Sequence, residues 1–254
     1  MHKVALVTGA GGGIGKGIAS ELAKAGYDLM IHSARNGAGA EETCRELSRL
    51  HGIEAHAVQA DLMEPGAVDI IFSALDEKYG RLDLYVNNAG VTEGAPFLKI
   101  TPEIVDRVFT INLRAAFFCV QSAAKRMVAN GTRGNIVIIS SNQQEVIMPG
   151  GAIYGPIKSA LTRLATHASM ELAAFGIRVN SISPGYVNSS ERMQPYYESS
   201  MPSIPLRRWA SVEEVGQAVL YLASPAAAFI TGSCLKMDGG ATNGYYLLER
   251  FSQD

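Results

Sequence analysis

The chain has 254 residues, of which 47% are hydrophobic and 18% charged, and this composition excludes an intrinsically disordered protein. Lys and Arg number 22 against 24 Asp and Glu, so the formal net charge of -2 predicts neither nucleic acid nor an anionic membrane as a partner. The three cysteines are far apart in the sequence and the histidines show no zinc-ligand spacing, so we expect a cytoplasmic protein without disulfides or a metal site.

Short apolar segments alternate with longer segments of helical periodicity from one end of the chain to the other. Several of the short segments are apolar at nearly every position, which is typical of strands buried on both faces of a parallel sheet. The alternation therefore predicts a doubly wound α/β sheet in a single domain over residues 1–254. The predicted strands are Val4–Val7, Leu29–Ile31, Ala55–Gln59, Leu82–Val86, Ile136–Ile139, Val179–Ile182 and Ser233–Met237.

A glycine-rich turn, Thr8–Lys16, follows the first predicted strand and precedes a helical pattern. Glycines let the backbone turn tightly and approach a pyrophosphate, whose charge meets the amides at the helix N-terminus. The spacing is G-x-x-x-G-x-G through Gly9, Gly13 and Gly15, and it differs from the strict G-x-G-x-x-G fingerprint. We expect a dinucleotide cofactor here, the alternative being a simple tight turn.

The end of the second strand predicts which nicotinamide cofactor the chain prefers. An acidic residue there would accept bonds from the ribose 2′-hydroxyl of NAD, but this chain has Arg35, and Asp28 lies at the wrong end of the strand. Arg35 can pair with a 2′-phosphate, with Lys16 assisting. We therefore expect NADP(H) rather than NAD(H); the alternative for Arg35 is a solvated loop arginine.

A tyrosine and a lysine one helical turn apart, Tyr154 and Lys158, begin the helical pattern over residues 151–174. Residues i and i+4 share one face of a helix, and an ammonium near a phenol favours the phenolate. The pair is therefore a candidate proton donor and acceptor for carbonyl–alcohol interconversion. Pro156 is tolerated only in the first helical turn, so the helix should begin near Tyr154.

The segment from Pro184 to Ala210 is the least regular part of the chain and contains Tyr196, Tyr197 and the only tryptophan, Trp209. In an open parallel sheet the ligand lies outside the carboxyl ends of the strands. An irregular segment there predicts a substrate lid at about residues 185–210. The alternative is a surface excursion packed by its own aromatic side chains. A capping-box pattern at Ser211 then predicts a further helix.

In their order and spacing, the motifs of the chain resemble those of the short-chain dehydrogenase/reductase family over about residues 2–240. They are Thr8-Gly9-x-x-x-Gly13-Ile14-Gly15, Asp61-Leu62, Asn87-Asn88-Ala89-Gly90, Asn112, Ser141 thirteen residues before Tyr154, Pro184-Gly185 and Asp238-Gly239-Gly240. The resemblance implies a Rossmann-like, three-layer α/β/α fold with seven strands. It also implies an NAD(P)(H)-dependent oxidoreductase that interconverts a secondary alcohol and a ketone or aldehyde.

The resemblance implies four catalytic residues. Tyr154 would be the general acid in reduction and the base in oxidation, and Lys158 would bind the nicotinamide ribose and favour the phenolate. Ser141 would donate a hydrogen bond to the reacting oxygen; the adjacent Ser140 is disfavoured by strand alternation and by the spacing. Asn112, within the fourth helix, would hold a water that passes protons to Lys158, or would only satisfy the backbone at a helix kink.

The resemblance also implies how the cofactor is held. Asp61 would bond the adenine edge, Asn88 would lie near the adenosine ribose, and Val187 would meet the carboxamide. Asn87 and Asn88 could instead act mainly as a polar brace between strands. The full implied set is Gly9, Gly13, Ile14, Gly15, Arg35, Asp61, Leu62, Asn88, Ala89, Gly90, Tyr154, Lys158, Pro184, Gly185, Val187 and Ser189, the last replacing a threonine common in the family.

The expected substrate is a small-molecule alcohol or carbonyl compound bound in a polar pocket. The residues expected to face it are Glu93, Gln143, Glu145 and Tyr186. A 3-oxoacyl thioester fits the family resemblance, and so does a sugar or polyol, because Ile204–Leu206 and the tail resemble the glucose 1-dehydrogenase branch. A catalytically silent dinucleotide-binding sensor is the alternative from another class.

The family association further implies a homotetramer. The apolar helices around residues 101–130 and 151–174 would pack across one interface. The apolar tail Gly244–Leu248 would fit another.

Overall fold

The structure is a computed structural model that describes residues 2–190 and 195–243, and its strands form one seven-stranded parallel sheet of order β3-β2-β1-β4-β5-β6-β7. The predicted tail contact at Gly244–Leu248 and residues 191–194 of the predicted lid lie outside the described residues. The strands are β1 Val4–Val7, β2 Asp28–Ser33, β3 Ala55–Gln59, β4 Leu84–Asn87, β5 Asn135–Ile139, β6 Arg178–Pro184 and β7 Cys234–Met237. Each predicted strand is present; β1 and β3 have the predicted bounds, and β4 begins two residues later than expected.

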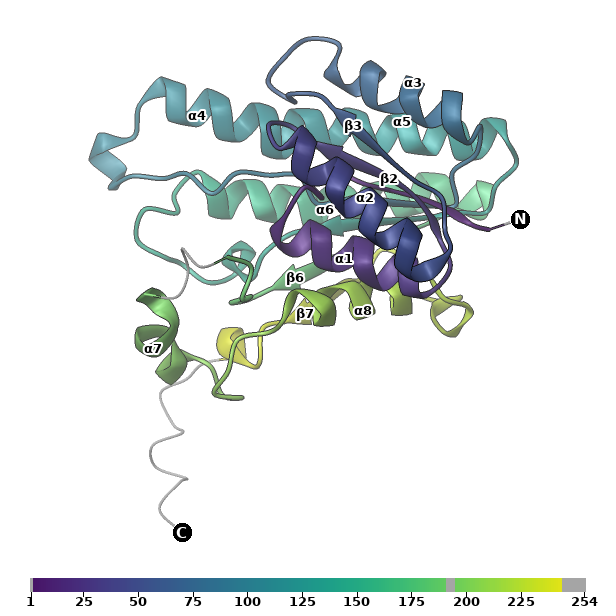
Figure 1. The fold of residues 1–254 in the computed structure, drawn as a ribbon. Helices are drawn as coiled ribbons and strands as arrows, with labels where there is room; N and C mark the ends of the chain where they lie inside the picture. Colours follow the sequence, from purple (N-terminus) through teal and green to yellow (C-terminus); the bar gives the residue numbers. More distant parts are fainter. Residues whose placement is uncertain (1, 191–194, 244–254) are drawn as a thin grey trace.

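Helices cover both faces of the sheet (Figure 1). Side chains of α1, α2 and α8 pack on one face, and those of α3, α5 and α6 pack on the other. The α-helices are α1 Gly13–Lys24, α2 Gly37–His51, α3 Ala67–Lys78, α4 Pro102–Phe109, α5 Ala116–Ala129, α6 Tyr154–Leu172, α7 Tyr197–Ser200 and α8 Val212–Ala223. Short 3-10 turns are η1 Phe97–Lys99, η3 Asn142–Gln144, η4 Ala173–Phe175, η6 Met201–Ser203, η7 Pro225–Ala227 and η8 Ala241–Asn243, and η2 Thr110–Ala115 is a π-helix.

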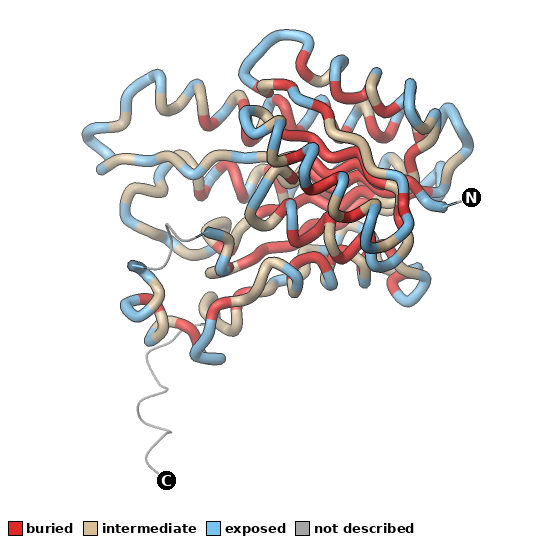
Figure 2. The backbone as a smooth tube through the Cα atoms, in the orientation of Figure 1, coloured by how far each residue is buried: buried red, intermediate tan, exposed pale blue. Residues whose placement is uncertain are grey.

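The strands form a continuously buried core between the two helical layers (Figure 2). In β1 all four residues are buried, and in β5 every residue after Asn135 is buried. Burial on both faces explains why these strands are apolar at consecutive positions rather than at alternate ones. The three-layer α/β/α architecture with a Rossmann-like sheet is therefore as predicted.

Local signals place the starts of two helices as the sequence predicts. Ser211 caps α8: its hydroxyl accepts a hydrogen bond from the Glu214 amide at 3.2 Å, and the Glu214 carboxylate accepts one from the Ser211 amide at 2.8 Å. This reciprocal pair satisfies two amides that the helix itself leaves without partners. Helix α6 begins at Tyr154, so Pro156 lies in the first turn, where its missing N–H costs no bond.

Two glycines allow α1 and α8 to pack very closely. A Cβ on Gly17 would lie 2.5 Å from the Val212 Cβ, and one on Gly216 would lie 2.7 Å from the Glu21 Cγ. Contacts this short exclude any side chain at either position without movement of the helices. Helix α8, which follows the 185–210 segment, is thereby fixed against α1, which follows the glycine turn.

The order of the strands defines where a ligand can bind. The chain runs outward from β1 through β2 to β3 in one direction and from β4 to β7 in the other, so the order reverses between β1 and β4. In such sheets the crevice at the carboxyl ends of the two central strands binds ligands. Among the described residues, no helix has the length and apolar character to cross a membrane.

Candidate active site

The glycine turn at the end of β1 is shaped by close backbone contacts. Gly9 has φ +68°, a left-handed conformation that favours glycine, and a Cβ on Gly15 would lie 2.3 Å from the Gly9 carbonyl oxygen. Gly12, the N-cap of α1, makes no side-chain cap, and a Cβ there would meet nothing within 4 Å. No side chain therefore caps the start of α1, and the space beside Gly12 is open, as a phosphate site requires.

A threonine and an asparagine hold the ends of β1 and β4 together beneath this turn. The Thr8 hydroxyl accepts hydrogen bonds from the amides of Asn88 and Ala89, both at 3.1 Å. The Asn88 side-chain amide donates to the carbonyls of Thr8 and Gly9 at 2.9 and 3.2 Å. The alternative of a polar brace therefore describes what the Asn88 side chain does in this structure, and Asn88 also lines a pocket beside the turn.

A buried histidine on β2 contacts the same turn and was not among the residues expected at the site. His32 is fully buried; its Nδ1 lies 3.2 Å from the Gly9 amide nitrogen and its Nε2 lies 2.8 Å from the Ala60 carbonyl oxygen. The available sequence signal was a polar residue next to the apolar segment Leu29–Ile31. Burial is the main cause that lowers the pKa of this imidazole below its ordinary value of 6.5.

A pocket of about 330 Å³, which we call the arginine pocket, lies where β1, β2 and β3 end. It contains Arg35, whose side chain is exposed, together with Asp61, which also accepts a hydrogen bond from the Met63 amide at 3.0 Å. Lys16 does not line this pocket, and its ammonium lies 3.5 Å from the Glu46 carboxylate. The lining residues are Gly9, Gly11, Gly12, His32, Ser33, Ala34, Arg35, Asn36, Asp61, Leu62, Ala89, Gly90, Val91, Arg107 and Ile111.

A second pocket of about 210 Å³, the tyrosine pocket, adjoins the first. The two share lining residues at the glycine turn and after β4, so they form one continuous site. The tyrosine pocket brings Tyr154 and Lys158 to the first turn of α1. Its lining residues are Gly9, Gly12, Gly13, Ile14, Gly15, Asn88, Gly90, Val91, Thr92, Ile139, Ser140, Tyr154, Lys158 and Ser189.

The lysine of the tyrosine pocket is buried and held at both ends. The Lys158 ammonium donates to the Ile139 carbonyl at 3.1 Å and lies 5.3 Å from the centroid of the Tyr154 ring. The Lys158 backbone carbonyl accepts a hydrogen bond from the Ser140 hydroxyl at 2.8 Å. The end of β5 thus fixes the lysine beside the tyrosine.

The two serines after β5 have different environments. The Ser140 hydroxyl is engaged with α6 through Lys158, whereas the Ser141 hydroxyl accepts a bond from the Gln143 amide at 3.2 Å and caps η3. Because Ser141 acts there as an acceptor, its hydroxyl proton can be donated to another group. Strand β5 ends at Ile139 as predicted, and of the two serines that follow it Ser140 lines the tyrosine pocket whereas Ser141 does not.

Asn112 lies in the π-helix η2, between α4 and α5, rather than within a regular fourth helix as expected. Its side chain forms two hydrogen bonds with the backbone of Val91, accepting from the amide and donating to the carbonyl, both at 2.8 Å. The wider π-turn lets the side chain reach the loop after β4, since π-bulges open the helical ladder. Asn112 therefore satisfies backbone groups of a residue that lines both pockets.

The polar residues expected to face the substrate are not gathered around Tyr154. Gln143 and Glu145 line another pocket of about 330 Å³, which Phe97 also lines. The Glu145 carboxylate lies 2.6 Å from the Lys236 ammonium, and the Glu93 carboxylate lies 3.4 Å from the Arg107 Nε. These ion pairs give both carboxylates partners within the chain.

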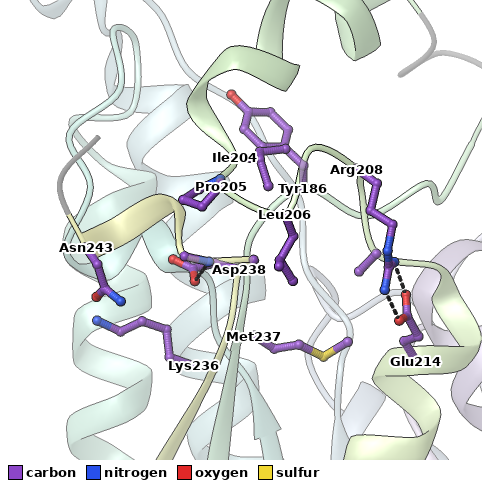
Figure 3. Close-up of a pocket in the computed structure, with 13 residues that line it drawn as sticks. Tyr186, Ile204, Pro205, Leu206, Arg208, Glu214, Lys236, Met237, Asp238 and Asn243 are labelled. Carbon is purple, nitrogen blue, oxygen red and sulfur yellow. Dashed lines mark hydrogen bonds and ion pairs between the residues drawn. The ribbon is translucent and has the colours of Figure 1, made fainter. Parts of the chain in front are cut away.

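Tyr186 lines a different pocket, of about 600 Å³, between the 185–210 segment and β7 (Figure 3). Figure 3 shows Arg208 and Glu214 joined at one side of this pocket and Lys236 at another. The Tyr186 ring also stacks on Trp209 with centroids 5.4 Å apart. Tyr186 and Tyr197 thus both pack on Trp209.

The residues that follow β6 anchor the base of this segment. The Gly185 amide donates to the Met237 carbonyl at 3.0 Å, and buried Val187 forms a bridge with Ala210. Neither Pro184, Gly185 nor Val187 lines the two pockets at the glycine turn, whereas Ser189 lines the tyrosine pocket. Within the described part of the chain, no cluster of three or more His, Cys, Asp or Glu side chains could hold a metal ion.

A Tyr–Lys pair and a glycine turn at the switch point of a doubly wound sheet define a nicotinamide-dependent oxidoreductase of the Rossmann-like class. A family model described as "Enoyl-(Acyl carrier protein) reductase" matches residues 9–242. The chain belongs to the short-chain dehydrogenase/reductase family and is an enzyme of that family.

Three relatives illustrate the match. The 3-oxoacyl-[acyl-carrier-protein] reductase FabG of Staphylococcus aureus is 33% identical over 94% of this chain and 98% of its own length. The acetoin dehydrogenase of Enterobacter cloacae is 36% identical, with a TM-score of 0.89 and coverage of 96% of each chain. The angucycline C-6 ketoreductase LanV, solved with bound NADP, is 35% identical, with a TM-score of 0.89 and coverage of 95% of this chain and 96% of its own.

Proposed function

We propose that the chain interconverts a secondary alcohol and a ketone or aldehyde by NADP(H)-dependent hydride transfer, with Tyr154 as the general acid and base. One observation carries the proposal: Tyr154 and buried Lys158 line the same pocket as the first-turn glycines of α1. A proton-transfer pair and a phosphate cradle within one small pocket are what carbonyl reduction requires.

The residues present fit a dinucleotide cofactor. The amides at the start of α1 have no capping side chain, and the space beside Gly12 is open. The tyrosine and arginine pockets are continuous, as an elongated ligand with two nucleoside halves requires. The adenosine half would occupy the arginine pocket beside Asp61 and Leu62, and the nicotinamide half would lie in the tyrosine pocket beside Lys158 and Ser189.

When bound, the cofactor supplies or accepts the hydride, and the residues of the chain handle the proton. In reduction the Tyr154 hydroxyl donates its proton to the carbonyl oxygen, and the Ser141 hydroxyl stabilises the charge that develops on that oxygen. Lys158 binds the ribose, and its positive charge favours the phenolate that proton donation leaves behind. Asn112 holds Val91 and with it the loop against which a proton-relay water would rest.

NADP(H) is favoured over NAD(H) by the arginine pocket. Arg35 lines this pocket at the end of β2 and can pair bidentately with a 2′-phosphate. The pocket contains no carboxylate at the end of β2 that would bond the 2′-hydroxyl of NAD. LanV, with its bound NADP, gives a parallel in a relative of comparable identity.

The first substrate to test is a 3-oxoacyl thioester, which the name of FabG supports. The alternative is a sugar or polyol, and the acetoin dehydrogenase adds a small hydroxyketone to the candidates. Purified protein would be screened against all three classes with NADPH and NADH, following the absorbance of the reduced nicotinamide. No turnover with any secondary alcohol or carbonyl compound would favour the silent dinucleotide sensor.

The acid–base role has its own test. Tyr154→Phe removes only the phenolic oxygen and should lower kcat by about 10²–10⁴-fold, the usual contribution of a positioned proton donor. The dissociation constant of NADP+ should change by no more than a few-fold, because the ring itself remains and at most one hydrogen bond of modest value is lost. Unchanged turnover would contradict the assignment.

We further propose that the segment at about residues 185–210 is a lid that closes over a small-molecule substrate. We also propose that the protein is a homotetramer. Exposed phenylalanines on the α4–α5 side support an interface there. Phe109, Phe117 and Phe118 are 45%, 45% and 41% exposed, and the rings of Phe117 and Phe118 lie 5.5 Å apart; exposed large apolar side chains that lie together are typical of a subunit contact.

A further inference from the structure

His32 connects the glycine turn to the ends of two neighbouring strands. The Gly9 N–H donates to its Nδ1 at 3.2 Å, and the opposite nitrogen, Nε2, lies 2.8 Å from the Ala60 carbonyl. The His32 backbone carbonyl also accepts a hydrogen bond from the Ala10 amide at 2.8 Å. Side chain and backbone of one residue therefore hold two successive amides of the turn.

These partners determine which form of the imidazole is compatible with the turn. A carbonyl oxygen can only accept, so Nε2 must carry a proton, and an amide can only donate, so Nδ1 must be unprotonated. The neutral Nε2–H tautomer satisfies both partners. A doubly protonated ring would direct an N–H against the Gly9 N–H and leave that amide without an acceptor.

We propose that His32 is a positioning residue for the cofactor, which holds Gly9 in its binding conformation only while the imidazole is neutral. The inference rests on the proposed function, because it concerns the affinity of the glycine turn for a dinucleotide. Gly9 lines both pockets, and its carbonyl contacts Asn88, so displacement of its peptide disturbs the whole site. Acidification should therefore weaken cofactor binding before it affects the fold.

The charges around His32 come from three elements. Asp61, in the loop after β3, attracts the protonated form, whereas Arg35 after β2 and Arg107 of α4 line the same pocket with positive charge. The β1 side contributes Thr8 and Gly9, neither of which titrates in this range. Burial is the largest influence on the pKa of His32 and lowers it, outweighing the hydrogen bond to Ala60 and the charge of Asp61, which both raise it, so the neutral imidazole is favoured at physiological pH.

The test compares two substitutions by titration calorimetry with NAD+ and NADP+. His32→Asn keeps a side-chain oxygen near the position of Nδ1 but cannot be protonated, while His32→Leu has no acceptor. Near neutral pH the Leu variant should bind either cofactor about tenfold more weakly than the natural protein, the effect of one unsatisfied amide, while the Asn variant stays within about threefold.

The decisive measurement is the pH dependence from about pH 8 to about pH 5. Affinity of the natural protein for NAD+ should fall, approaching about tenfold per pH unit below the pKa of His32 in the free protein, and that of His32→Asn should stay level. NAD+ has no 2′-phosphate, so the titration of that group does not contribute to its pH profile. With NADP+ the 2′-phosphate titrates too, and its contribution should be the same for the natural protein and for His32→Asn. Parallel profiles for the two proteins would overturn the proposal.

A measurement on the natural protein covers the case in which a variant fails to fold. Nitrogen NMR shifts of His32 should show the Nε2–H tautomer, and saturation with NAD+, which brings no 2′-phosphate charge near the imidazole, should move its titration midpoint to lower pH. A midpoint that stays or rises would refute the positioning role. Absence of any dinucleotide binding at neutral pH would instead refute the proposed function, and the tautomer measurement would still report on the contact with Gly9.

Discussion

Substitution of Gly15 by alanine tests whether close backbone packing shapes the phosphate cradle. A Cβ at this position would lie 2.3 Å from the Gly9 carbonyl oxygen and 2.7 Å from the Ala10 Cα. Contacts between a Cβ and another heavy atom below 3.0 Å are essentially never observed, so the first pair must separate by about 0.7 Å. Both neighbours are backbone atoms, which cannot rotate away as the end of a flexible side chain could.

The displacement should affect binding more than folding. Gly15 is helical, so alanine gains about 1 kcal/mol of helix propensity, which offsets part of the roughly 1–3 kcal/mol that overpacking costs. The thermal midpoint should therefore fall by only a few degrees. Hydrogen bonds to a charged acceptor contribute about 1.5–3 kcal/mol each, so loss of one from the turn should weaken NADP+ binding by about 10–100-fold.

Gly134→Ala is the control, because its added Cβ is also overpacked but lies just before β5, at the end of the sheet away from both pockets. The Cβ would lie 2.6 Å from the Met127 Sδ. The thermal midpoint of Gly134→Ala should fall, but its NADP+ affinity, measured by the same calorimetry, should change by less than about threefold, because distant sites act independently. The reasoning is refuted if Gly15→Ala binds NADP+ as tightly as Gly134→Ala does.

Three further substitutions test other parts of the structure. Arg35→Ala should weaken NADP+ binding about tenfold and leave NAD+ binding unchanged. Equal losses of affinity for both cofactors would contradict the proposed contact between Arg35 and the 2′-phosphate. The hydrogen bond from Arg208 lowers the pKa of Glu214 from its ordinary value of 4.5 to about 2. The ionised carboxylate therefore stabilises the fold fully above pH 4.5, and this stabilisation is lost as the pH falls toward 2. Glu214→Gln should accordingly lower the thermal midpoint at pH 7 but not near pH 2, and exposed Glu213→Gln should change little at either pH; a Glu214→Gln effect independent of pH would contradict the linkage. Phe118→Asp should reduce the molar mass seen by light scattering to below that of a tetramer, with Leu50→Asp on α2 as the control, and an unchanged mass would exclude this interface.

The strands were predictable because burial on both faces requires consecutive apolar residues. The apolar segment Leu29–Ile31 covers only the middle of β2, which continues through His32 and ends at Ser33. Hydrophobicity alone could not extend it, because His32 is buried by virtue of partners on two other segments, Gly9 and Ala60. A residue satisfied by distant backbone groups has no local signature of burial.

That Tyr154 and Lys158 line one pocket was predictable for a local reason, since i and i+4 in one helix necessarily share a face. The choice of Ser141 over Ser140 stays a prediction: the Ser140 hydroxyl bonds the Lys158 carbonyl of α6, but Ser140 rather than Ser141 lines the tyrosine pocket. The π-helix around Asn112 was not predictable, because it coincides with two hydrogen bonds to Val91, far away in the sequence. The ion pairs of Glu93 and Glu145 are likewise formed with residues on other elements.

The stacking of Trp209 on Tyr186 has a practical consequence for experiments on this protein. Trp209 is the only tryptophan in the chain, it is 4% exposed, and its indole N–H donates to the Ser200 hydroxyl at 2.8 Å. Tyr197 meets it edge-on, with ring centroids 5.2 Å apart. All tryptophan emission therefore comes from one site at the base of the 185–210 segment, and the natural protein carries its own fluorescent reporter of rearrangement there, with no label to introduce.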